Sequence, residues 1–291
     1  MSAGAMESSN PGTIALVGPG RAGTTIALAL LELGWHVMSV AGRAPDAPST
    51  VSAAACLGAE QTLVTDVARG ASVVIVATPD RSIEAAARAI APSIEPDALV
   101  FHLAGSLGLG AFASLLDVRS DVRVGALHPL QLFPSASMGI ERLRGAWAAV
   151  AGDTQTTELA RTMGMRPFEL ADSERAQYHA AAVVASNHLV ALLGQVERLA
   201  AACGVPFEAF APLVGSSVAD AFALGPARAL TGPVSRGDLA TVEKHLATLD
   251  PGERDAYRTL AREVARLTGR RDSAIDRLLD DVRNAPPSEP A

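Results

Sequence analysis

Gly18-Pro19-Gly20-Arg21-Ala22-Gly23 is the stretch of sequence that decides the fold of this chain. Its spacing is Gly-x-Gly-x-x-Gly. The apolar run Ile14-Ala15-Leu16-Val17 before it predicts a buried strand, and residues 24–33 after it have the pattern of a helix. The first glycine permits a tight turn, the second lets a phosphate approach the backbone, and the third lets the helix pack on the sheet. Because a helix N-terminus attracts anions, the stretch predicts the diphosphate site of a dinucleotide; the alternative is an empty turn of the same shape.

Strand and helix signals alternate through the first half of the chain. Apolar runs rich in Val, Ile and Ala predict strands, and runs with helical spacing predict the helices between them. The expected strands are residues 36–41, 62–64, 71–77, 98–103, 122–127, 147–151 and 166–170, and the expected helices are residues 49–57, 82–90, 107–116 and 156–163. This alternation predicts an α/β domain of Rossmann type with a mostly parallel sheet, in which ligands bind at the carboxyl ends of the strands.

The pattern changes near Asp172, after which no strong strand signal follows. An Ala-rich helix is expected from Ser173 to Cys203 without a breaker. Further helices are expected over residues 207–224, 238–249, 253–267 and 274–282. We therefore expect a nucleotide-binding domain over 13–171 and an all-α domain for substrate binding and dimerisation over 172–283, with a disordered lead over 1–12 and a disordered tail over 284–291.

The composition limits the class of protein. The 291 residues are 49% hydrophobic but only 4% aromatic, so Ala, Leu and Val build the expected core. The formal net charge of −7 argues against nonspecific binding to nucleic acid, which needs a basic surface. Cys56 and Cys203 predict neither a disulfide framework nor a cysteine-rich zinc site. We expect no signal peptide and no stretch apolar enough for long enough to span a membrane, and hence a cytoplasmic protein.

The end of the second expected strand selects the nucleotide. Proteins that bind NAD usually place an acidic residue there for the ribose 2′-OH, whereas Val40-Ala41-Gly42-Arg43 ends on a cation that pairs with a 2′-phosphate. The sequence therefore favours NADP(H) over NAD(H); the nearby Asp46, or a merely solvated Arg43, would argue otherwise. Thr78-Pro79-Asp80 is expected beside the ribose or nicotinamide, with Asp80 as a possible helix cap. The expected cofactor-binding residues are Gly18, Pro19, Gly20, Arg21, Ala22, Gly23, Arg43, Thr78, Pro79 and Ala104.

Two histidines stand at the ends of apolar strands. His102 opens His102-Leu103-Ala104-Gly105-Ser106, and His128 opens a run that includes Gln131. A polar side chain in such a place is costly unless it has a partner. We expect His128 to bind substrate or relay a proton, with Ser106 and Gln131 as substrate-binding residues. The alternative, a histidine that shapes a turn, is favoured for His102.

The long helix carries a second set of candidate catalytic residues. His179, Val183 and Asn187 are spaced by four residues and therefore lie near one face, with Tyr178 adjacent to it. Facing an inter-domain cleft, Asn187 would bind a substrate oxygen, and His179 or Tyr178 would exchange the proton that accompanies hydride transfer. The alternative is a set of hydrogen bonds between helices in the core.

A turn-rich break between helices supplies a third candidate. In Leu230-Thr231-Gly232-Pro233-Val234-Ser235-Arg236-Gly237-Asp238, the guanidinium of Arg236 could bind a substrate carboxylate, and Asp238 could cap the next helix. We expect no metal site, because the His and acidic residues are scattered. A Ser-His-Asp hydrolase is also disfavoured, because no Gly-x-Ser-x-Gly turn follows a strand.

The motifs together resemble the Rossmann-like proteins that carry the domain of unknown function 2520. The resemblance rests on the Gly18–Gly23 turn, His102–Ser106, His128-Pro129-Leu130-Gln131-Leu132-Phe133, Tyr178–Asn187 and Leu230–Asp238, and extends from about Thr13 to Val282. That family is similar in plan to the 6-phosphogluconate dehydrogenase-like superfamily, which includes ketopantoate reductases, prephenate dehydrogenases and pyrroline-carboxylate reductases. The resemblance implies a nucleotide-binding domain, a helical C-terminal domain, and a homodimer that forms through the helical domains.

One departure from the related enzymes bears on activity. Several relatives carry Lys-x-x-x-Asn on the first long helix of the second domain, with the lysine as proton donor; here Asn187 matches the Asn, but Val183 occupies the lysine position. We expect an NADP-dependent oxidoreductase acting on a small anionic keto acid, hydroxy acid or imine, with a 2-keto acid such as ketopantoate as the leading guess. The alternatives are a prephenate-type dehydrogenase, a non-catalytic NADP-binding sensor or scaffold, and a deazaflavin-dependent NADP reductase.

Overall fold

The computed structural model describes residues 11–269 and 273–280. Most of the expected disordered lead (1–12) and the whole expected disordered tail (284–291) lie outside the described residues. The chain divides into two compact units, Met1–Ser186 and Asn187–Ala291, which are described separately below. The division between Ser186 and Asn187 falls within the helical run Asp172–Ala202. The domain limit expected from the change in sequence pattern lies earlier, between residues 171 and 172, and stays a prediction.

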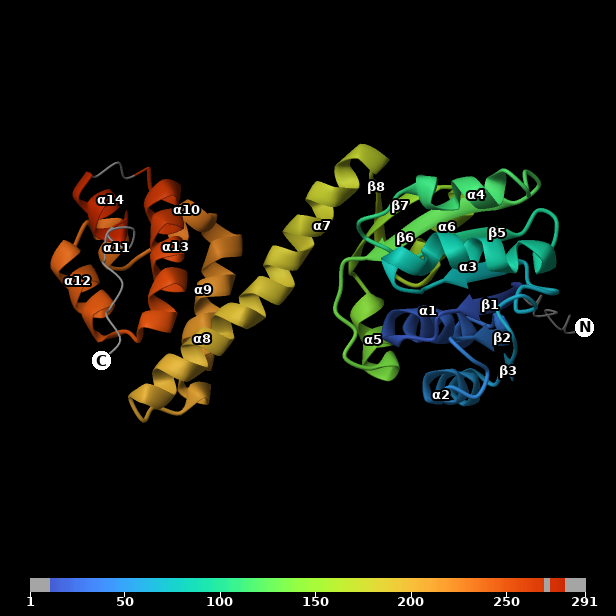
Figure 1. Ribbon diagram of the computed structural model, residues 1–291, viewed down its shortest axis with the longest axis horizontal. Helices are drawn as coiled ribbons and strands as arrows, with labels where there is room; N and C mark the ends of the chain where they lie inside the picture. The colour runs from blue at the N-terminus through green and yellow to red at the C-terminus, as the bar shows by residue number, and fades with distance from the viewer. Residues whose placement is uncertain (1–10, 270–272, 281–291) are drawn as a thin grey trace, which may run out of the picture. The chain divides into compact units, whose positions relative to one another are not determined.

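An eight-stranded sheet forms the centre of the first unit (Figure 1). Its strands are β1 (Thr13–Val17), β2 (His36–Ala41), β3 (Glu60–Gln61), β4 (Val73–Val76), β5 (Leu99–His102), β6 (Arg123–Pro129), β7 (Trp147–Gly152) and β8 (Arg166–Glu169). The spatial order is β3-β2-β1-β4-β5-β6-β7-β8, and every pair is parallel except β6 with β7. The predicted mostly parallel sheet is therefore confirmed. Its order reverses between β1 and β4, which is where such sheets bind ligands.

Helices cover both faces of this sheet. They are α1 (Arg21–Glu32), α2 (Pro48–Leu57), α3 (Ile83–Ile90), α4 (Ala113–Leu116), α5 (Ala136–Leu143) and α6 (Thr154–Thr162). Helix α7 (Arg175–Val183) follows β8 and contributes no residue to the two core clusters beside the sheet. Alternate residues of each strand enter opposite cores: Leu16 of β1 packs with the cluster that includes α1, α2 and α6, and Val17 packs with the cluster that includes α3 and α4. Because both faces of the sheet are buried, the strands read as continuous apolar runs.

Three local expectations require correction. Residues 62–64 do not form a strand, because the third strand is the short Glu60–Gln61. The helix expected over 107–116 is a 3₁₀ turn, Leu109–Phe112, followed by the single turn of α4. Helix α5 was not expected; Ser135 caps its N-terminus through its hydroxyl, and α5 lies beside α1 (Figure 1). Gly139 permits this contact, since an added Cβ would lie 2.5 Å from the hydroxyl oxygen of Thr25.

The described residues of the second unit form helices joined by short turns, without a strand, as expected. Its helices are α8 (Leu189–Ala202), α9 (Ala211–Leu224), α10 (Pro226–Ala229), α11 (Pro233–Arg236), α12 (Leu239–Thr248), α13 (Pro251–Leu267) and α14 (Ser273–Asp280). A small core unites α11 to α14 around Val242 and Leu246. Helix α8 joins α13 through Gln195, whose amide donates to the Glu253 carbonyl, and through the Arg198–Glu253 ion pair.

The expectation that no stretch is long and apolar enough to span a membrane is wrong. The helical run Asp172–Ala202 and the run Phe207–Leu224 both have the required length, with a mean hydropathy of 1.3 in the best window. Only 6% and 0% of these windows are buried within the chain. This is weak support for a membrane protein, because helices of soluble proteins pass the same test of length and composition. Both runs expose large apolar side chains, among them Val184, Val190, Leu213 and Phe222.

Candidate functional site

The glycine-rich turn connects β1 to α1 with the geometry that a diphosphate site needs. Gly18 has φ +87°, and an added Cβ there would lie 2.6 Å from the backbone nitrogen of Thr78. A Cβ at Gly23 would lie 2.6 Å from the Cβ of Ala77, so this glycine lets α1 pack closely on the sheet. At Gly20, which is exposed and precedes the first residue of α1, an added Cβ would meet no atom within 4 Å of the described structure.

The N-terminus of α1 is also free to bind an anion. In the described structure no side chain caps it, and its first turn contains no acidic residue. Its N–H groups and partial positive charge therefore face open space above Gly20. The residues present fit the diphosphate of a dinucleotide, with Pro19, Arg21 and Ala22 completing the turn.

The other residues expected to contact the cofactor surround this turn. Arg43 is exposed and directly follows Gly42, where an added Cβ would lie 3.3 Å from the ring of Pro19. The hydroxyl of Thr78 is buried without a hydrogen-bond partner among the described residues, and Pro79 is exposed beside it. An unpaired buried hydroxyl next to Gly18 is a polar group that a ligand can satisfy. Ala104 is buried, and its N–H donates to Nδ1 of His102.

His102 has a structural role. It is fully buried at the end of β5, and its Nε2 bonds the carbonyl oxygen of Gly108 at 3.1 Å. Both ring nitrogens are therefore engaged with the backbone of the loop that follows β5. Burial lowers the pKa of His102, which keeps the ring neutral. The structure thus agrees with the expectation of a histidine that shapes a turn.

His128 and Tyr178 form the central polar pair of the site. His128 lies within β6, past the register at which β1, β4 and β5 end, and its Nδ1 lies 2.8 Å from the hydroxyl oxygen of Tyr178 on α7. The ring of His179 is perpendicular to that of His128, with centroids 5.9 Å apart. Three of the four expected catalytic residues are therefore brought together, although His128 lies about fifty positions before the adjacent Tyr178 and His179 in the sequence.

Burial sets the protonation of this pair. It lowers the pKa of His128 to about 4, with further lowering by the positive charges of His179 and Arg175. Burial also raises the pKa of Tyr178 to about 12. At neutral pH the imidazole is uncharged and the phenol keeps its proton, so the pair holds a single shared hydrogen bond whose direction depends on the tautomer.

The loop after β5 lies against these rings. Gly105 is buried, and an added Cβ would lie 2.7 Å from the ring of His179 and 2.8 Å from Nε2 of His128. A side chain at this position would displace both histidines. The next residue, Ser106, donates a 2.5 Å hydrogen bond to the carboxylate of Asp80, which lies at the start of the 3₁₀ turn after β4. Ser106 and Asp80 thus link the carboxyl ends of two neighbouring strands.

The remaining expected residues lie on other segments of the chain. Gln131 is exposed, and its side-chain oxygen accepts from the N–H of Leu132. Asn187 and Arg236 belong to the second unit, where both are exposed. Asn187 lies in a π-helical turn, Val184–His188, that interrupts the long helix expected without a break. Asp238 caps α12 by accepting from the N–H of Thr241, so the capping alternative proposed for it is confirmed.

Arg175 is the residue of this region that sequence reasoning missed. It is fully buried in the first turn of α7, three and four positions before Tyr178 and His179. Its helical spacing from these two residues is the signal that could have found it, since it is the basic residue on their face. The sequence alone gives little reason to expect this arginine to be buried, because an arginine is usually exposed to solvent.

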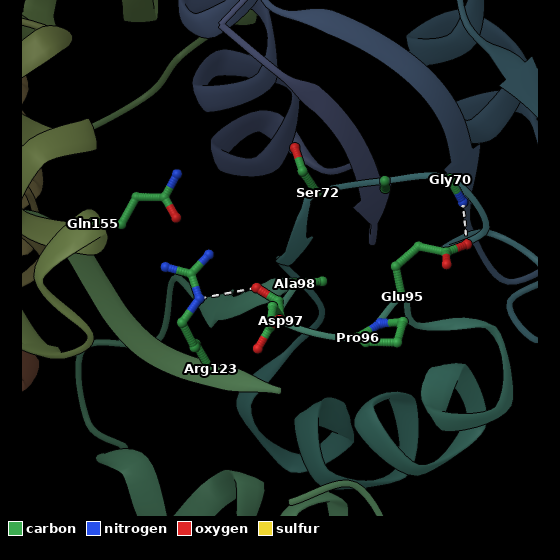
Figure 2. A pocket seen from close by; sticks show the side chains of 9 residues that line it. Gly70, Ser72, Glu95, Pro96, Asp97, Ala98, Arg123 and Gln155 are labelled. Carbon is green, nitrogen blue, oxygen red and sulfur yellow. Dashed lines mark hydrogen bonds between the residues drawn. The ribbon is translucent and has the colours of Figure 1, made fainter. Parts of the chain in front are cut away.

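A cavity of about 330 Å³ lies elsewhere, at the amino ends of β4, β5 and β6. Figure 2 shows Arg123 donating to the carbonyl of Asp97 and Glu95 accepting from the N–H of Gly70, both across this cavity. Because sheets of this kind bind ligands at the opposite, carboxyl edge, the cavity is separate from the residues described above. The described residues contain no group of three or more His, Cys, Asp or Glu that could hold a metal ion.

Comparison with protein families agrees with the motifs. Residues 148–264 match the model of the domain of unknown function DUF2520, and residues 13–104 match that of the family described as NADP oxidoreductase, coenzyme F420-dependent. The resemblance to the domain of unknown function 2520 is confirmed for residues 148–264, whereas the match of residues 13–104 is to the NADP oxidoreductase model. No curated protein matches the sequence.

Solved structures share the fold. BF3122 from Bacteroides fragilis, a proposed NADP oxidoreductase, is 24% identical, with a TM-score of 0.74 over 88% of this chain and 98% of that one. Protein TM1727 from Thermotoga maritima is 22% identical, with a TM-score of 0.61 over 93% and 96% of the two chains. A pyrroline-5-carboxylate reductase from Coxiella burnetii is 16% identical, with a TM-score of 0.54 over 91% and 95%. At these identities the likeness establishes an NADP oxidoreductase-like fold.

Proposed function

We propose that this protein is an NADP(H)-dependent oxidoreductase that reduces a small keto acid or imine, or oxidises the corresponding hydroxy acid or amine. The observation that carries the proposal is the His128–Tyr178 pair beyond the carboxyl edge of the same sheet whose β1–α1 turn fits a diphosphate. When bound, the nicotinamide dinucleotide supplies or accepts the hydride. The protein residues then need to bind the substrate and to exchange one proton with its oxygen or nitrogen.

Tyr178 is the proposed proton donor, and His128 its partner. In reduction of a carbonyl, a hydride added to carbon leaves an alkoxide, which is a stronger base than a phenolate and therefore takes the Tyr178 proton. His128 returns a proton to the phenolate through Nδ1 and takes up another from solvent at Nε2, which regenerates the phenol and leaves the imidazole as its other neutral tautomer. Proton exchange with solvent, with loss at Nε2 and gain at Nδ1, restores the starting state before the next turnover. A neutral imidazole is needed for this exchange, which agrees with a pKa of about 4. This pair would take the role of the proton-donating lysine that the related enzymes carry at the position of Val183.

NADP(H) is the proposed nucleotide because Arg43 follows β2 without an acidic residue at the strand end. Its exposed guanidinium lies next to Gly42, which packs near Pro19 of the glycine-rich turn. A 2′-phosphate on the ribose would pair with Arg43 by charge-assisted hydrogen bonds.

A homodimer through the second unit is proposed as the functional assembly. The exposed fractions of Phe222, Leu213 and Val190 are 90%, 65% and 62%, and all three lie on α8 or α9. Large apolar side chains exposed together in this way favour burial against a second copy of the same surface. A small anionic substrate and a cytoplasmic location complete the proposal.

A deazaflavin-dependent NADP reductase is the second candidate, favoured by the family that residues 13–104 match. Hydride exchange between two cofactors would require no proton donor of the His128–Tyr178 kind. The two candidates therefore differ in how much they depend on this pair.

The experiment is a turnover assay with NADPH and a panel of 2-oxo acids and cyclic imines, with coenzyme F420 as a separate arm. For a substrate of the panel, His128→Gln and Tyr178→Phe should each lower kcat by about 100-fold and leave the Kd of NADPH within about twofold. The matched control removes a pair of the same geometry in the second unit: His245 Nδ1 lies 2.8 Å from the Tyr257 hydroxyl, and Tyr257→Phe should keep full activity. Binding of NADPH without turnover of any compound would instead support a sensor.

A further inference from the structure

Arg175 carries a buried positive charge whose N–H donors have no hydrogen-bond partner among the described residues. Its side chain is 0% exposed, and none of its three nitrogens forms a hydrogen bond with a described residue. The nearest carboxylate belongs to Asp172, whose Oδ1 lies 3.7 Å from Nε, beyond hydrogen-bond distance, and whose side chain is 50% exposed. A guanidinium has five N–H donors in a planar array, and leaving them unpaired away from water is strongly unfavourable. Such a group therefore needs an acceptor from outside the chain.

The acceptor would lie beside the proposed catalytic pair. Arg175, Tyr178 and His179 share one face of α7 at spacings of three and four residues. Asp172 lies against the loop after β5, because a Cβ added at Gly108 would overlap its carboxylate, and His102 bonds the carbonyl of that same glycine. In addition to burial, the charge of Arg175 acts on the pKa of His102, His128 and Tyr178. The guanidinium is thus embedded among the residues that the proposed reaction uses.

We propose that Arg175 binds the carboxylate of the substrate, and that the substrate is a 2-oxo acid or the matching 2-imino acid. This inference rests on the proposed function. A carboxylate matches the planar fork of a guanidinium and can accept two parallel hydrogen bonds. In a 2-oxo acid the reacting carbonyl is bonded directly to the carboxylate carbon. Residues three apart on a helix are neighbours, so a carboxylate on Arg175 sets the keto oxygen within reach of the Tyr178 hydroxyl.

The proposal also explains why a buried guanidinium is retained in a first helical turn with one ion pair, to Asp172, and no protein hydrogen-bond acceptor. A residue that only stabilised the fold would be paired in the free protein, whereas a ligand-binding residue is left unsatisfied until the ligand arrives. Because the guanidinium is inaccessible to solvent in the free protein, the proposal requires the side chains that cover Arg175 to move aside when the carboxylate binds.

The test measures ligand binding by calorimetry in the presence of NADP⁺, which cannot reduce the probe. 2-Oxobutyrate should bind the wild-type protein, its uncharged counterpart 2-oxobutyramide should bind at least about tenfold more weakly, and inorganic phosphate should not compete. Arg175→Met should weaken binding of 2-oxobutyrate by about tenfold or more, and Arg175→Lys by less, because the ammonium lacks the planar fork. Arg69→Met, which removes a surface charge that is 73% exposed, should bind as the wild type does.

A second measurement separates a binding role from a structural one. Without ligand, the thermal midpoint of Arg175→Met should equal or exceed that of the wild type, because the variant removes buried N–H donors that have no hydrogen-bond acceptor. 2-Oxobutyrate should raise the midpoint of the wild type but not of Arg175→Met. A lower midpoint of the variant together with unchanged 2-oxobutyrate binding would overturn the proposal.

The failures of this inference and of the proposed function are distinguishable. If NADPH binds but Arg175→Met binds 2-oxobutyrate as the wild type does, the role of Arg175 is wrong and the dinucleotide function stands. If 2-oxobutyrate binds through Arg175 while neither reduced nor oxidised nicotinamide dinucleotide binds, the oxidoreductase function is wrong and the anion site stands. Absence of both kinds of binding contradicts both.

Discussion

At the scale of single residues, the protonation of His128 is the property on which the proposed proton exchange depends. Burial is the main cause of its pKa of about 4, against an ordinary value of 6.5. Between these values the unfolded chain binds a proton that the folded chain does not, so the free energy of unfolding falls as the pH is lowered from 6.5 to 4. Above pH 6.5 this contribution is constant.

The first prediction concerns this dependence on pH. The loss of stability due to His128 between pH 6.5 and pH 4 should be roughly 2–3 kcal/mol, and His128→Gln should flatten the curve by that amount. Denaturant unfolding at a series of pH values measures it. His102 contributes in the same direction because burial lowers its pKa too, so the variant should retain part of the slope. A curve for His128→Gln that parallels the wild type would show that His128 titrates normally in the folded protein.

Arg43 carries the second prediction, on the choice of nucleotide. Arg43→Ala removes the cation proposed to pair with the 2′-phosphate, so the Kd of NADPH should rise about tenfold or more while that of NADH changes by less than about twofold. Fluorescence titration with each nucleotide measures both constants. Arg69→Ala, another exposed arginine of the same unit, serves as the charge-matched control. Equal weakening of NADPH and NADH binding by Arg43→Ala would remove the argument for NADP.

At the scale of elements, the β1–α1 turn provides a pair of glycines with opposite predicted behaviour. Gly18→Ala should destabilise the fold by about 2 kcal/mol, because Gly18 has φ +87° and its Cβ would meet Thr78. Gly20→Ala should leave the thermal midpoint unchanged, since its Cβ enters open space, yet weaken NADPH binding about tenfold or more by filling the place of a phosphate. Thermal unfolding and calorimetry of both variants test this third prediction. Undiminished NADPH binding by Gly20→Ala would place the diphosphate elsewhere.

The sequence predicted the elements that have a simple pattern. The buried strands β1, β4 and β5 and the helix α1 follow from apolar runs and the glycine-rich turn. Helix α5 escaped prediction because it is only eight residues long and includes Gly139; its position depends on packing against α1. Strand β6 was expected to end at Leu127, but pairing with the antiparallel β7 extends it to Pro129, with His128 opposite Ala149. A contact between distant segments of this kind leaves no trace in a local pattern.

The sequence identified most residues of the candidate site but did not predict the contacts between them. Polar side chains at strand ends pointed to His128, and helical spacing pointed to Tyr178 and His179. The hydrogen bond that joins His128 to Tyr178 spans fifty positions and depends on where β8 directs α7. Arg175 was missed because burial of a charged residue is a tertiary property, and sequence reasoning assigns an arginine to the surface by default.

At the scale of the whole molecule, the exposed apolar surface of α8 and α9 yields the fourth prediction. The wild-type protein should be a dimer in light scattering coupled to size exclusion, and Phe222→Glu should shift it towards the monomer. Leu63→Glu, at a residue of the first unit that is 59% exposed, should leave the dimer intact. A monomeric wild type that sediments with lipid vesicles would instead assign this surface to a membrane.

The central claim, a dinucleotide bound over the β1–α1 turn, is tested most directly by isothermal calorimetry of NADPH and NADH with the wild-type protein and Gly20→Ala. The account predicts saturable binding of one NADPH per chain to the wild type, weaker binding of NADH, and loss of about tenfold or more in NADPH affinity in Gly20→Ala. No heat of binding with either nucleotide, from a protein that unfolds cooperatively and is therefore native, would contradict it.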